Sequence, residues 1–508
     1  MKDIPQFLEE SSTYQTIPIT YSFYSDTLTP IQLFERLRED AVYLLESGDH
    51  TSNWSRYSFI GLHPFVTITE QNKDILVHDV DTRETNHADS LQAAFEETFD
   101  TLNVLLPEIP LPFQGGGVGF VSYDAISDME KVPEHTENDL GLPHYHFLFC
   151  RTLVAFDHVK NTIHMIRYVR VHHEEGDASK VERYHEAVRH IEAMLTQLKE
   201  PGQSEVFIPP YTNRDVTLED VSTNYEKEAY KRDVEKIKEY IREGDVFQAV
   251  LSQRFSKQIT ADGFQLYRVL RHMNPSPYMF YLTYEGYEVI GSSPERLIQV
   301  ADKEIEIHPI AGTRKRGSTE EEDQALAEEL SADEKEKAEH FMLVDLARND
   351  VGRVAAFGTV QVPLLSEVTR FSRVMHMISK VTGELRDGVH PIQAFEAAFP
   401  AGTLSGAPKI RAMEILQELE PTARNLYGGG VVYFGFDGNL DSCIAIRTIL
   451  LKDQVAYIQA GAGVVADSDP EKEWQETVNK ASALLQTIEV AEEQFGSTLS
   501  LKEETHYA

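Results

Sequence analysis

The sequence predicts a large globular protein that is built from both helices and strands. Its 508 residues are enough for two or three domains, or for one large double-layered domain. Hydrophobic residues make up 41% of the chain and aromatic residues 10%, which is enough for an extensive core and excludes wholesale disorder. Runs typical of strands stand among stretches of helical apolar spacing along most of the chain.

The first 200 residues mix strands with helices. Strand-like runs cover residues 59–69, 148–156 and 163–171. A helix is expected over residues 179–198, where one apolar stripe is formed by Val181, Tyr184, Val188, Ile191, Leu195 and Leu198. Residues 200–204 and the pair Pro209-Pro210 then break the pattern, so the best boundary in the sequence lies at about 200–215.

An amphipathic helix follows this boundary, and its apolar face carries Tyr230, Val234, Ile237 and Ile241. From residue 244 to about 490, strands and helices alternate densely. The acidic stretch 320–339 is typical of a solvated helix face, with an apolar edge at Ala325, Leu326 and Leu330. The expected organisation is therefore an N-terminal region (1–215), a second domain (216–490) and a polar, frayed tail (491–508).

The charge of the chain limits its partners. It carries 83 acidic and 47 basic residues, a net charge of −36. This excludes nucleic acid and anionic membranes as expected partners, because phosphate binding needs clustered positive charge. An anionic small substrate stays possible, since a pocket can invert the sign locally. The chain has no run of roughly 18 uncharged apolar residues and no apolar signal-peptide core near its polar start, so a cytoplasmic protein is expected.

Several motifs in the chain do not support a metal or cofactor site. Cys150 and Cys443 stand in unrelated contexts, so neither a disulfide framework nor a cysteine-based metal site is expected. Residues 461–466 match the GxGxxA dinucleotide fingerprint, but residues 467–470 intervene before a helix can begin, so NAD binding is not expected. The pair at 172–173 is interpreted as a strand end and turn rather than a metal site.

Glu339 is a candidate for cation binding. In helical register it shares a face with Leu343 and Leu346, so its carboxylate tends toward the interior. A buried carboxylate needs a partner, and either a cation or a salt bridge would serve.

A second helix is expected to begin at Pro470, with Asp469 as its N-cap. Its positions Glu473, Glu476 and Lys480 fall on one face. Two carboxylates on separate helices can hold a Mg²⁺ ion that keeps several waters and bridges to an anionic substrate. The alternative is a solvated acidic face.

A strand is expected over residues 442–450, with Arg447 as the only charge on an otherwise small, apolar face. Arginine stays protonated, so a buried Arg447 needs an anion, either a ligand carboxylate or a protein Asp or Glu. Glycine-rich polar turns are expected beside strands at residues 311–314, 399–409 and 427–430. Glycine lets the backbone approach a ligand closely, and Pro408 can open a helix whose free N–H groups attract anions.

Six segments of the chain, in this order, resemble the chorismate-utilising enzymes. They are GDVFQAVLSQR (244–254), SPERL (293–297), PIAGTR (309–314) and the segments 339–350, 399–409 and 461–476. The resemblance covers about 220–490. Residues 44–47, 56–61 and 115–120 resemble regulatory segments of one branch, the large aminase subunits (component I) of anthranilate synthases. The resemblance implies an α+β fold of packed β-sheets that form a sandwich with helices outside, in which the two regions can interleave.

The resemblance also implies how chorismate is bound. Mg²⁺ would clamp its ring carboxylate, with ligands and helpers at Glu339, Glu476, Gly312 and Thr313. The positions that hold the enolpyruvyl carboxylate match Tyr427, Arg447, Gly461, Ala462 and Gly463. Lys480 and Thr403 match further polar positions that line the pocket, and Thr403 is counted among the catalytic residues.

The implied chemistry has two stages. Ammonia attacks ring C2 while the C4 hydroxyl leaves, and Glu295 matches the general acid that protonates it. The intermediate then loses its C2 proton and expels pyruvate to give anthranilate, and His376 matches the base. Aminodeoxychorismate synthases carry a nucleophilic lysine at the position of Ala311, whose methyl group cannot form the covalent adduct. Isochorismate and salicylate synthases carry a lysine base at the position of Gln248, whose neutral amide cannot deprotonate water.

The resemblance finally implies partners and regulation. Neither cysteine lies in the glycine-flanked elbow of an amidotransferase, so a separate glutaminase subunit is expected to supply ammonia, in a heterotetramer of two large and two small subunits. The reaction would be the first committed step of tryptophan biosynthesis. The resemblance implies feedback inhibition by tryptophan at Ser47, Pro277, Tyr278 and Met279. Residues 274–277 (Asn-Pro-Ser-Pro) are also typical of an ordinary turn.

Three alternatives remain beside this interpretation. One is a 2-amino-2-deoxyisochorismate synthase, which stops at the aminated intermediate, and another is an aminodeoxychorismate synthase component. His376 and the absence of a fused amidotransferase speak against the first, and Ala311 against the second. The third is a non-catalytic sensor of chorismate or tryptophan, which would lack the acid, the base or the carboxylates, yet Glu295, Glu339 and Glu476 are all present.

Overall fold

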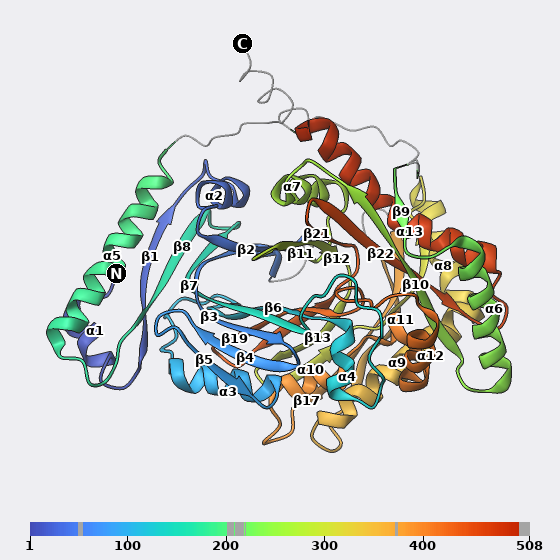
Figure 1. Ribbon diagram of the computed structural model, residues 1–508, viewed down its shortest axis with the longest axis horizontal. Coiled ribbons are helices and arrows are strands. Elements are labelled where there is room, and N and C mark those ends of the chain that lie inside the picture. Colours follow the sequence, from blue (N-terminus) through green and yellow to red (C-terminus); the bar gives the residue numbers. More distant parts are fainter. Residues whose placement is uncertain (49–53, 201–207, 209–217, 219, 371–373, 497–508) are drawn as a thin grey trace, which may run out of the picture.

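The computed structural model describes residues 1–48, 54–200, 208, 218, 220–370 and 374–496. The predicted boundary at 200–215 and most of the tail therefore lie outside the described residues. In the described part, the strands form antiparallel ladders that divide into two sheets (Figure 1).

Two long strands, β3 (Tyr57–Gln71) and β7 (Tyr145–Asp157), pair along almost their whole length and belong to both sheets. The first half of β3 pairs with β2 (Ala41–Glu46), and its second half with β4 (Asp74–Asp79). In β7 the order is reversed, because its first half pairs with β6 and its second half with β8. The sheet therefore divides in two at this central pair.

The first sheet has the order β1-β8-β7-β3-β2-β11-β12-β21-β22-β10. The bounds of its other strands are β1 (Thr16–Tyr24), β8 (Thr162–Arg170), β10 (Gln248–Gln258), β11 (Tyr278–Tyr284), β12 (Tyr287–Ser293), β21 (Thr448–Lys452) and β22 (Val455–Val464). Two short strands, β9 (Ser222–Thr223) and β18 (Gly406–Ala407), add to the outer edge of β10.

The second sheet has the order β5-β4-β3-β7-β6-β19-β20-β13-β14-β17, and β15 and β16 also pair with β17. The bounds of these strands are β5 (Glu84–Ala88), β6 (Gly116–Val121), β13 (Arg296–Ala301), β14 (Glu304–Ile307), β15 (Ile310–Lys315), β16 (Gln361–Arg370), β17 (Val374–Glu384), β19 (Gly430–Gly435) and β20 (Leu440–Ile444). In Figure 1, β11, β12, β21 and β22 lie above β6, β19 and β13.

Three main apolar cores hold the layers together. The core between the sheets joins inward-facing side chains of both, such as Phe59, Phe120, Phe280 and Cys443. The other two cores lie on the outer faces and are covered by helices. The helices that cover the first sheet are α1 (Ile4–Glu10), α2 (Pro30–Arg36), α5 (Asp177–Gln197), α7 (Gly263–Met273) and α13 (Pro470–Ala491). On the second they include α3 (Leu91–Leu102), α4 (Ile126–Met129), α9 (Glu334–Val354) and α10 (Pro391–Ala398).

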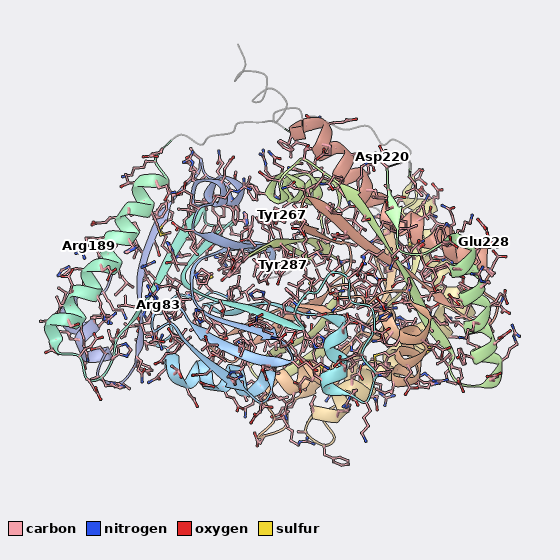
Figure 2. The ribbon with its side chains drawn as sticks, viewed as in Figure 1. Arg83, Arg189, Asp220, Glu228, Tyr267 and Tyr287 are labelled. Carbon is pink, nitrogen blue, oxygen red and sulfur yellow. The ribbon has the colours of Figure 1, made fainter. Side chains whose placement is uncertain are left out.

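The predicted α+β sandwich with helices outside is thus confirmed, and side chains fill the space between its layers (Figure 2). The two predicted regions interleave, because β2 pairs with β11 and β6 with β19. Two further helices, α6 (Lys227–Glu243) and α12 (Lys409–Leu419), share a smaller core beside β10. In the described chain, we find no helix whose length and apolarity would let it cross a membrane.

The predicted helices are present, with local differences. The most buried face of α5 holds Tyr184, Ala187, Ile191 and Met194, so it is rotated from the predicted stripe, and Val188 is only half-buried. The acidic stretch forms α8 (Glu320–Ala332) and the start of α9.

Two local predictions are wrong. The strand predicted over 442–450 is two strands, because β20 ends at Ile444 in the second sheet and β21 begins at Thr448 in the first. The chain crosses between the sheets here, and Arg447 has a left-handed backbone with φ +51°. The turn predicted at 311–314 lies inside β15, where Gly312 (φ +66°) forms a bulge opposite β17.

Candidate active site

A cavity of about 1530 Å³ is lined by residues of both sheets and of α9 and α13. It brings together most of the predicted site residues, although they are spread over 200 positions of the sequence. Those that line it are Pro277, Tyr278, Met279, Glu295, Gly312, Thr313, Glu339, His376, Thr403, Tyr427, Arg447, Gly461, Gly463, Glu476 and Lys480. Ala462 is buried between the two lining glycines of β22, and Ser47 follows β2; neither is among the lining residues.

Glu295 is positioned by the chain just before β13. Its carbonyl oxygen accepts a hydrogen bond from the backbone N–H of Ile444 (3.0 Å), and its carboxyl Oε2 accepts one from Thr403 Oγ1 (3.3 Å). Burial raises the pKa of Glu295, and the Thr403 hydrogen bond and the charges of Lys480 and Arg447 only partly offset this. A carboxyl group in this state keeps its proton to a higher pH, as a general acid requires.

His376, in β17, is oriented by the bulge at Gly312. Its Nδ1 lies 3.0 Å from the carbonyl oxygen of Gly312 and 3.1 Å from Thr313 Oγ1. Because a carbonyl can only accept, Nδ1 must carry the proton of the neutral ring, which leaves the lone pair on Nε2. Gly312 has φ +66°, a left-handed conformation that favours glycine, and a Cβ there would also displace the side chain of Leu330, whose Cδ1 would lie 2.8 Å away. The structure therefore offers a fixed imidazole tautomer with Nε2 as the basic atom.

Arg447 lies at the crossing between the sheets. Among the described residues its guanidinium makes no ion pair, and Nη1 donates to the carbonyl oxygen of Lys480 (2.8 Å). Burial lowers its pKa, against the opposite effects of Tyr427 and Glu295. Of the two partners that the sequence left open, a protein carboxylate within ion-pair distance is not found among the described residues, although the charge of Glu295 acts on Arg447 from farther away. A ligand carboxylate would satisfy this cation.

Tyr427 also lines the cavity. Its hydroxyl is hydrogen-bonded to the backbone of Gly461, and a Cβ at Gly461 would lie 2.8 Å from that hydroxyl oxygen. Glycine at this position of β22 therefore lets the tyrosine reach the strand. Lys480 Nζ donates to the Gly461 carbonyl oxygen (2.9 Å) from α13, so strand, tyrosine and lysine converge.

The carboxylates of α9 and α13 face each other across the cavity. The pKa of Glu339 is raised by burial and then by the charges of Glu336 and Glu476, and that of Glu473 by burial and by Glu476. Glu476 also pairs with Lys480 at 2.7 Å. Glu339 and Glu473, whose pKa values are raised in part by the charge of Glu476, would be stabilised as carboxylates by a cation.

These carboxylates fit a magnesium ion. The described residues contain no cluster of three His, Cys, Asp or Glu side chains placed to hold a metal. A pair of carboxylates such as Glu339 and Glu476 would leave other positions to water and substrate oxygens. Mg²⁺ is commonly bound in this way, because it keeps several waters.

The predicted inhibitor segments lie side by side. β2 pairs with β11, with Glu46 opposite Met279, and the Gly48 N–H donates to the Ser276 carbonyl oxygen (2.8 Å). Ser47 is thus adjacent to the segment that carries Pro277, Tyr278 and Met279. Glu46 lies inside the segment 44–47, but the sequence analysis missed its individual role: it accepts hydrogen bonds from Tyr267 (2.6 Å; labelled in Figure 2) and Arg271.

Arg424 is a second residue that the sequence analysis missed. It is fully buried, pairs with Glu420, and donates to the carbonyl oxygens of Leu404 (2.7 Å) and Val250 (2.6 Å). Its guanidinium also lies 5.6 Å from the centre of the Tyr427 ring. The signal that could have found it is an arginine four residues after a glutamate and three before a site tyrosine.

Comparisons of the sequence with known proteins place the chain in one family. The family described as "chorismate binding enzyme" matches residues 40–486. The chain is 54% identical to anthranilate synthase component 1 of Geobacillus stearothermophilus over 492 residues, which cover 96% of this chain and 97% of that one. The corresponding protein of Bacillus subtilis (strain 168) is 52% identical over 497 residues (97% and 96%).

Solved structures extend the comparison to the fold. Anthranilate synthase component I from Streptococcus pneumoniae TIGR4 superposes with a TM-score of 0.74 at 36% identity, covering 91% of this chain and 98% of that one. The menaquinone-specific isochorismate synthase of Escherichia coli gives a TM-score of 0.69 at 20% identity, covering 96% and 98%. The second likeness shows the shared fold alone.

Proposed function

Because the chain belongs to the chorismate binding enzyme family, we propose that it is the aminase subunit (component I) of an anthranilate synthase. It converts chorismate and ammonia to anthranilate and pyruvate. The observation that carries the proposal is one cavity lined by three groups: the acid Glu295, whose pKa is raised by burial, the oriented base His376, and Arg447, whose guanidinium makes no ion pair within the described part of the chain. Ala311 and Gln248, which also line it, offer neither a nucleophilic nor a basic lysine.

The first stage is amination of the ring. The carboxylate of the enolpyruvyl group binds Arg447 and Tyr427 beside the backbone of Gly461 and Gly463. Ammonia then forms a bond to C2, the two ring double bonds shift, and the C4–oxygen bond breaks. Glu295 donates its proton to the departing hydroxyl, which leaves as water, and regains one as the new ammonium group loses a proton.

The second stage is elimination. Nε2 of His376 takes the proton from C2, and its electron pair completes the aromatic ring as the C3–oxygen bond breaks. The enolate of pyruvate leaves and takes up one proton at its methylene carbon to become pyruvate. Because Nδ1 of His376 is held by the Gly312 carbonyl, the basic nitrogen keeps a fixed direction in this step.

Magnesium is part of the proposal. Glu339 and Glu476 would hold Mg²⁺, which when bound supplies positive charge for the ring carboxylate of chorismate. This would let a chain with a net charge of −36 accept a dianion.

We also infer a separate glutaminase subunit, in a heterotetramer of two large and two small subunits. Both cysteines are buried, and burial raises the pKa of their thiols, so neither is suited to act as the thiolate nucleophile of a glutaminase. Inhibition by tryptophan at Ser47 and residues 277–279 completes the proposal. The supporting observation is that β2 and β11 place these segments together.

A product assay tests the proposal. The purified chain with chorismate, Mg²⁺ and ammonium should form fluorescent anthranilate, and glutamine should replace ammonium only after the glutaminase subunit is added. The product mass separates anthranilate from 2-amino-2-deoxyisochorismate and aminodeoxychorismate. If chorismate is bound but no anthranilate forms under either condition, the proposal is wrong.

A further inference from the structure

The side chain of Tyr278 connects the predicted inhibitor segment to the neighbour of the candidate general acid. Its hydroxyl oxygen lies 2.7 Å from Arg296 Nε and 3.1 Å from Asp441 Oδ1. Arg296 directly follows Glu295, and its Nε is 3.6 Å from the same carboxylate oxygen. Asp441 is only 2% exposed, so these contacts are shielded from solvent. We call these three side chains the Tyr278 cluster; Arg296 also pairs with Glu306, and Asp441 also accepts a hydrogen bond from Gln299 (3.1 Å).

The direction of each hydrogen bond in this cluster is fixed by chemistry. A guanidinium can only donate, so the Tyr278 oxygen accepts from Arg296. An ionised carboxylate can only accept, so the tyrosine proton goes to Asp441. The hydroxyl therefore serves both partners at once, and a phenyl ring could serve neither. Loss of the hydroxyl would leave a buried cation and a buried anion each one hydrogen bond short.

The Tyr278 cluster also joins the two sheets. Tyr278 begins β11 of the first sheet, whereas Arg296 and Asp441 lie in the paired strands β13 and β20 of the second. Glu295 is held by the same two strands, because its carbonyl oxygen accepts from Ile444 at the end of β20. A movement of Tyr278 relative to β13 and β20 would thus act on the backbone that carries Glu295.

We propose that Arg296 is a positioning residue for Glu295, and that the Tyr278 hydroxyl makes this position depend on whether tryptophan occupies the inhibitor site. The proposal rests on the proposed function above. Tryptophan bound against Pro277 and Met279 shifts Tyr278, Arg296 loses one of its partners, and Glu295 leaves its place beside Thr403. Amination is then slowed.

The chain offers a matched control. Tyr281 lies three residues later in the same strand, is buried, and places its hydroxyl 2.8 Å from the carboxylate of Glu288. It belongs to the outer core of the first sheet rather than to the cavity. Tyr281→Phe therefore removes a similar hydroxyl from β11 without touching the Tyr278 cluster.

The experiment compares wild type, Tyr278→Phe and Tyr281→Phe with ammonia as the nitrogen source. Calorimetry gives the tryptophan affinity, and kinetics give kcat and the chorismate KM over a range of tryptophan concentrations. Tyr278→Phe removes from Arg296 the same partner that tryptophan binding is proposed to remove, so we expect its kcat to be lowered already in the absence of tryptophan. It should bind tryptophan within about threefold of wild type but lose at least about fivefold of the further inhibitory effect, the lower end of usual allosteric coupling. Tyr281→Phe should keep both.

A second variant separates positioning from folding. Arg296→Lys has no guanidinium fork with which to contact Tyr278, Asp441 and Glu306 together, so Glu295 should be displaced. We expect kcat to fall, the chorismate KM to stay within about twofold, and tryptophan to bind without inhibiting. Near-ultraviolet circular dichroism confirms that the variant is folded.

Four results would count against the inference. Full inhibition of Tyr278→Phe would show that the hydroxyl transmits nothing. A loss of tryptophan binding of more than about tenfold, roughly 1.4 kcal/mol, would make the hydroxyl a ligand instead of a link. An Arg296→Lys variant that changes only KM would remove its role beside Glu295. If the wild type makes anthranilate but neither binds tryptophan nor responds to it, the proposed inhibitor site fails, and the inference with it.

Discussion

Replacing Glu295 by glutamine should abolish most of the catalytic rate without changing substrate affinity. Glutamine has the shape of glutamate and keeps an oxygen that can accept from Thr403, whose Oγ1 is 3.3 Å from the carboxylate. It cannot release a proton to the C4 hydroxyl. A positioned general acid contributes about 10²- to 10⁴-fold, which corresponds to roughly 2.7–5.5 kcal/mol in the barrier. We therefore expect kcat to fall by this factor while the chorismate KM stays nearly constant.

The pH dependence adds a second readout with a defined sign. Burial raises the pKa of Glu295, and an acid works only while protonated, so the wild-type kcat should fall as the pH rises through this raised pKa. In Glu295→Gln this descending limb should disappear, since an amide does not titrate. The assay follows anthranilate fluorescence with saturating chorismate, and compares variant with wild type at equal concentrations of free ammonia.

A matched control shows whether the effect belongs to the site. Glu288 is also a largely buried carboxyl group whose pKa is raised chiefly by burial, and Tyr281 donates to it, but it does not line the cavity. Glu288→Gln should keep kcat within about threefold, as expected for a change away from the chemistry. The reasoning is refuted if Glu295→Gln retains more than about a tenth of kcat, or if its loss appears only in KM.

Three further predictions concern the metal, the base and acid stability. Glu339→Gln and Glu476→Gln should each weaken Mg²⁺ binding at least about tenfold by calorimetry, whereas Glu473→Gln should have a smaller effect; equal effects would contradict the assignment. His376→Ala should accumulate the aminated intermediate, visible by mass spectrometry, because C2 keeps its proton; an unchanged product spectrum would exclude it as the base. Burial alone would raise the pKa of Glu306, but it is lowered from 4.5 to about 2 by its contacts with His308, Lys380 and Arg296. Its contribution to stability is therefore present above pH 4.5 and lost as the pH falls toward 2. Glu306→Gln should reduce stability at neutral pH and make the loss of stability between pH 4.5 and 2 less steep in acid titrations; an unchanged profile would show that these contacts contribute nothing.

Local spacing was enough to predict the parts of the site that single elements determine. Asp469 caps α13 as predicted, and its side chain accepts from the Lys472 N–H (3.0 Å). The helical period also placed Glu339, Glu476 and Lys480 on the faces that line the cavity. These predictions succeed because side-chain direction in a helix follows from the period alone.

The layout of the sheets follows from contacts that no local pattern encodes. β3 and β7 each pair with different strands along their two halves, and this gives two sheets from one set of strands. The pairing of β2 with β11 joins residues more than 230 positions apart. Hydrophobic alternation shows that each segment is a strand, but it does not identify its neighbour.

Arg447 shows how the same limit affects the chemistry. Its neighbours alternate as a strand would, and no glycine, proline or asparagine marks a break between Ser442 and Leu450. The break arises because β20 belongs to one sheet and β21 to the other, so the chain must cross between them in three residues. The crossing places Arg447 in the left-handed region, at a cost of about 1–3 kcal/mol for a residue other than glycine. A continuous strand would have kept its guanidinium within one sheet, whereas the crossing places it in the cavity that both sheets line. The strained backbone and the position of the guanidinium in the cavity thus have one cause, and that cause lies in the sandwich rather than in the sequence around residue 447.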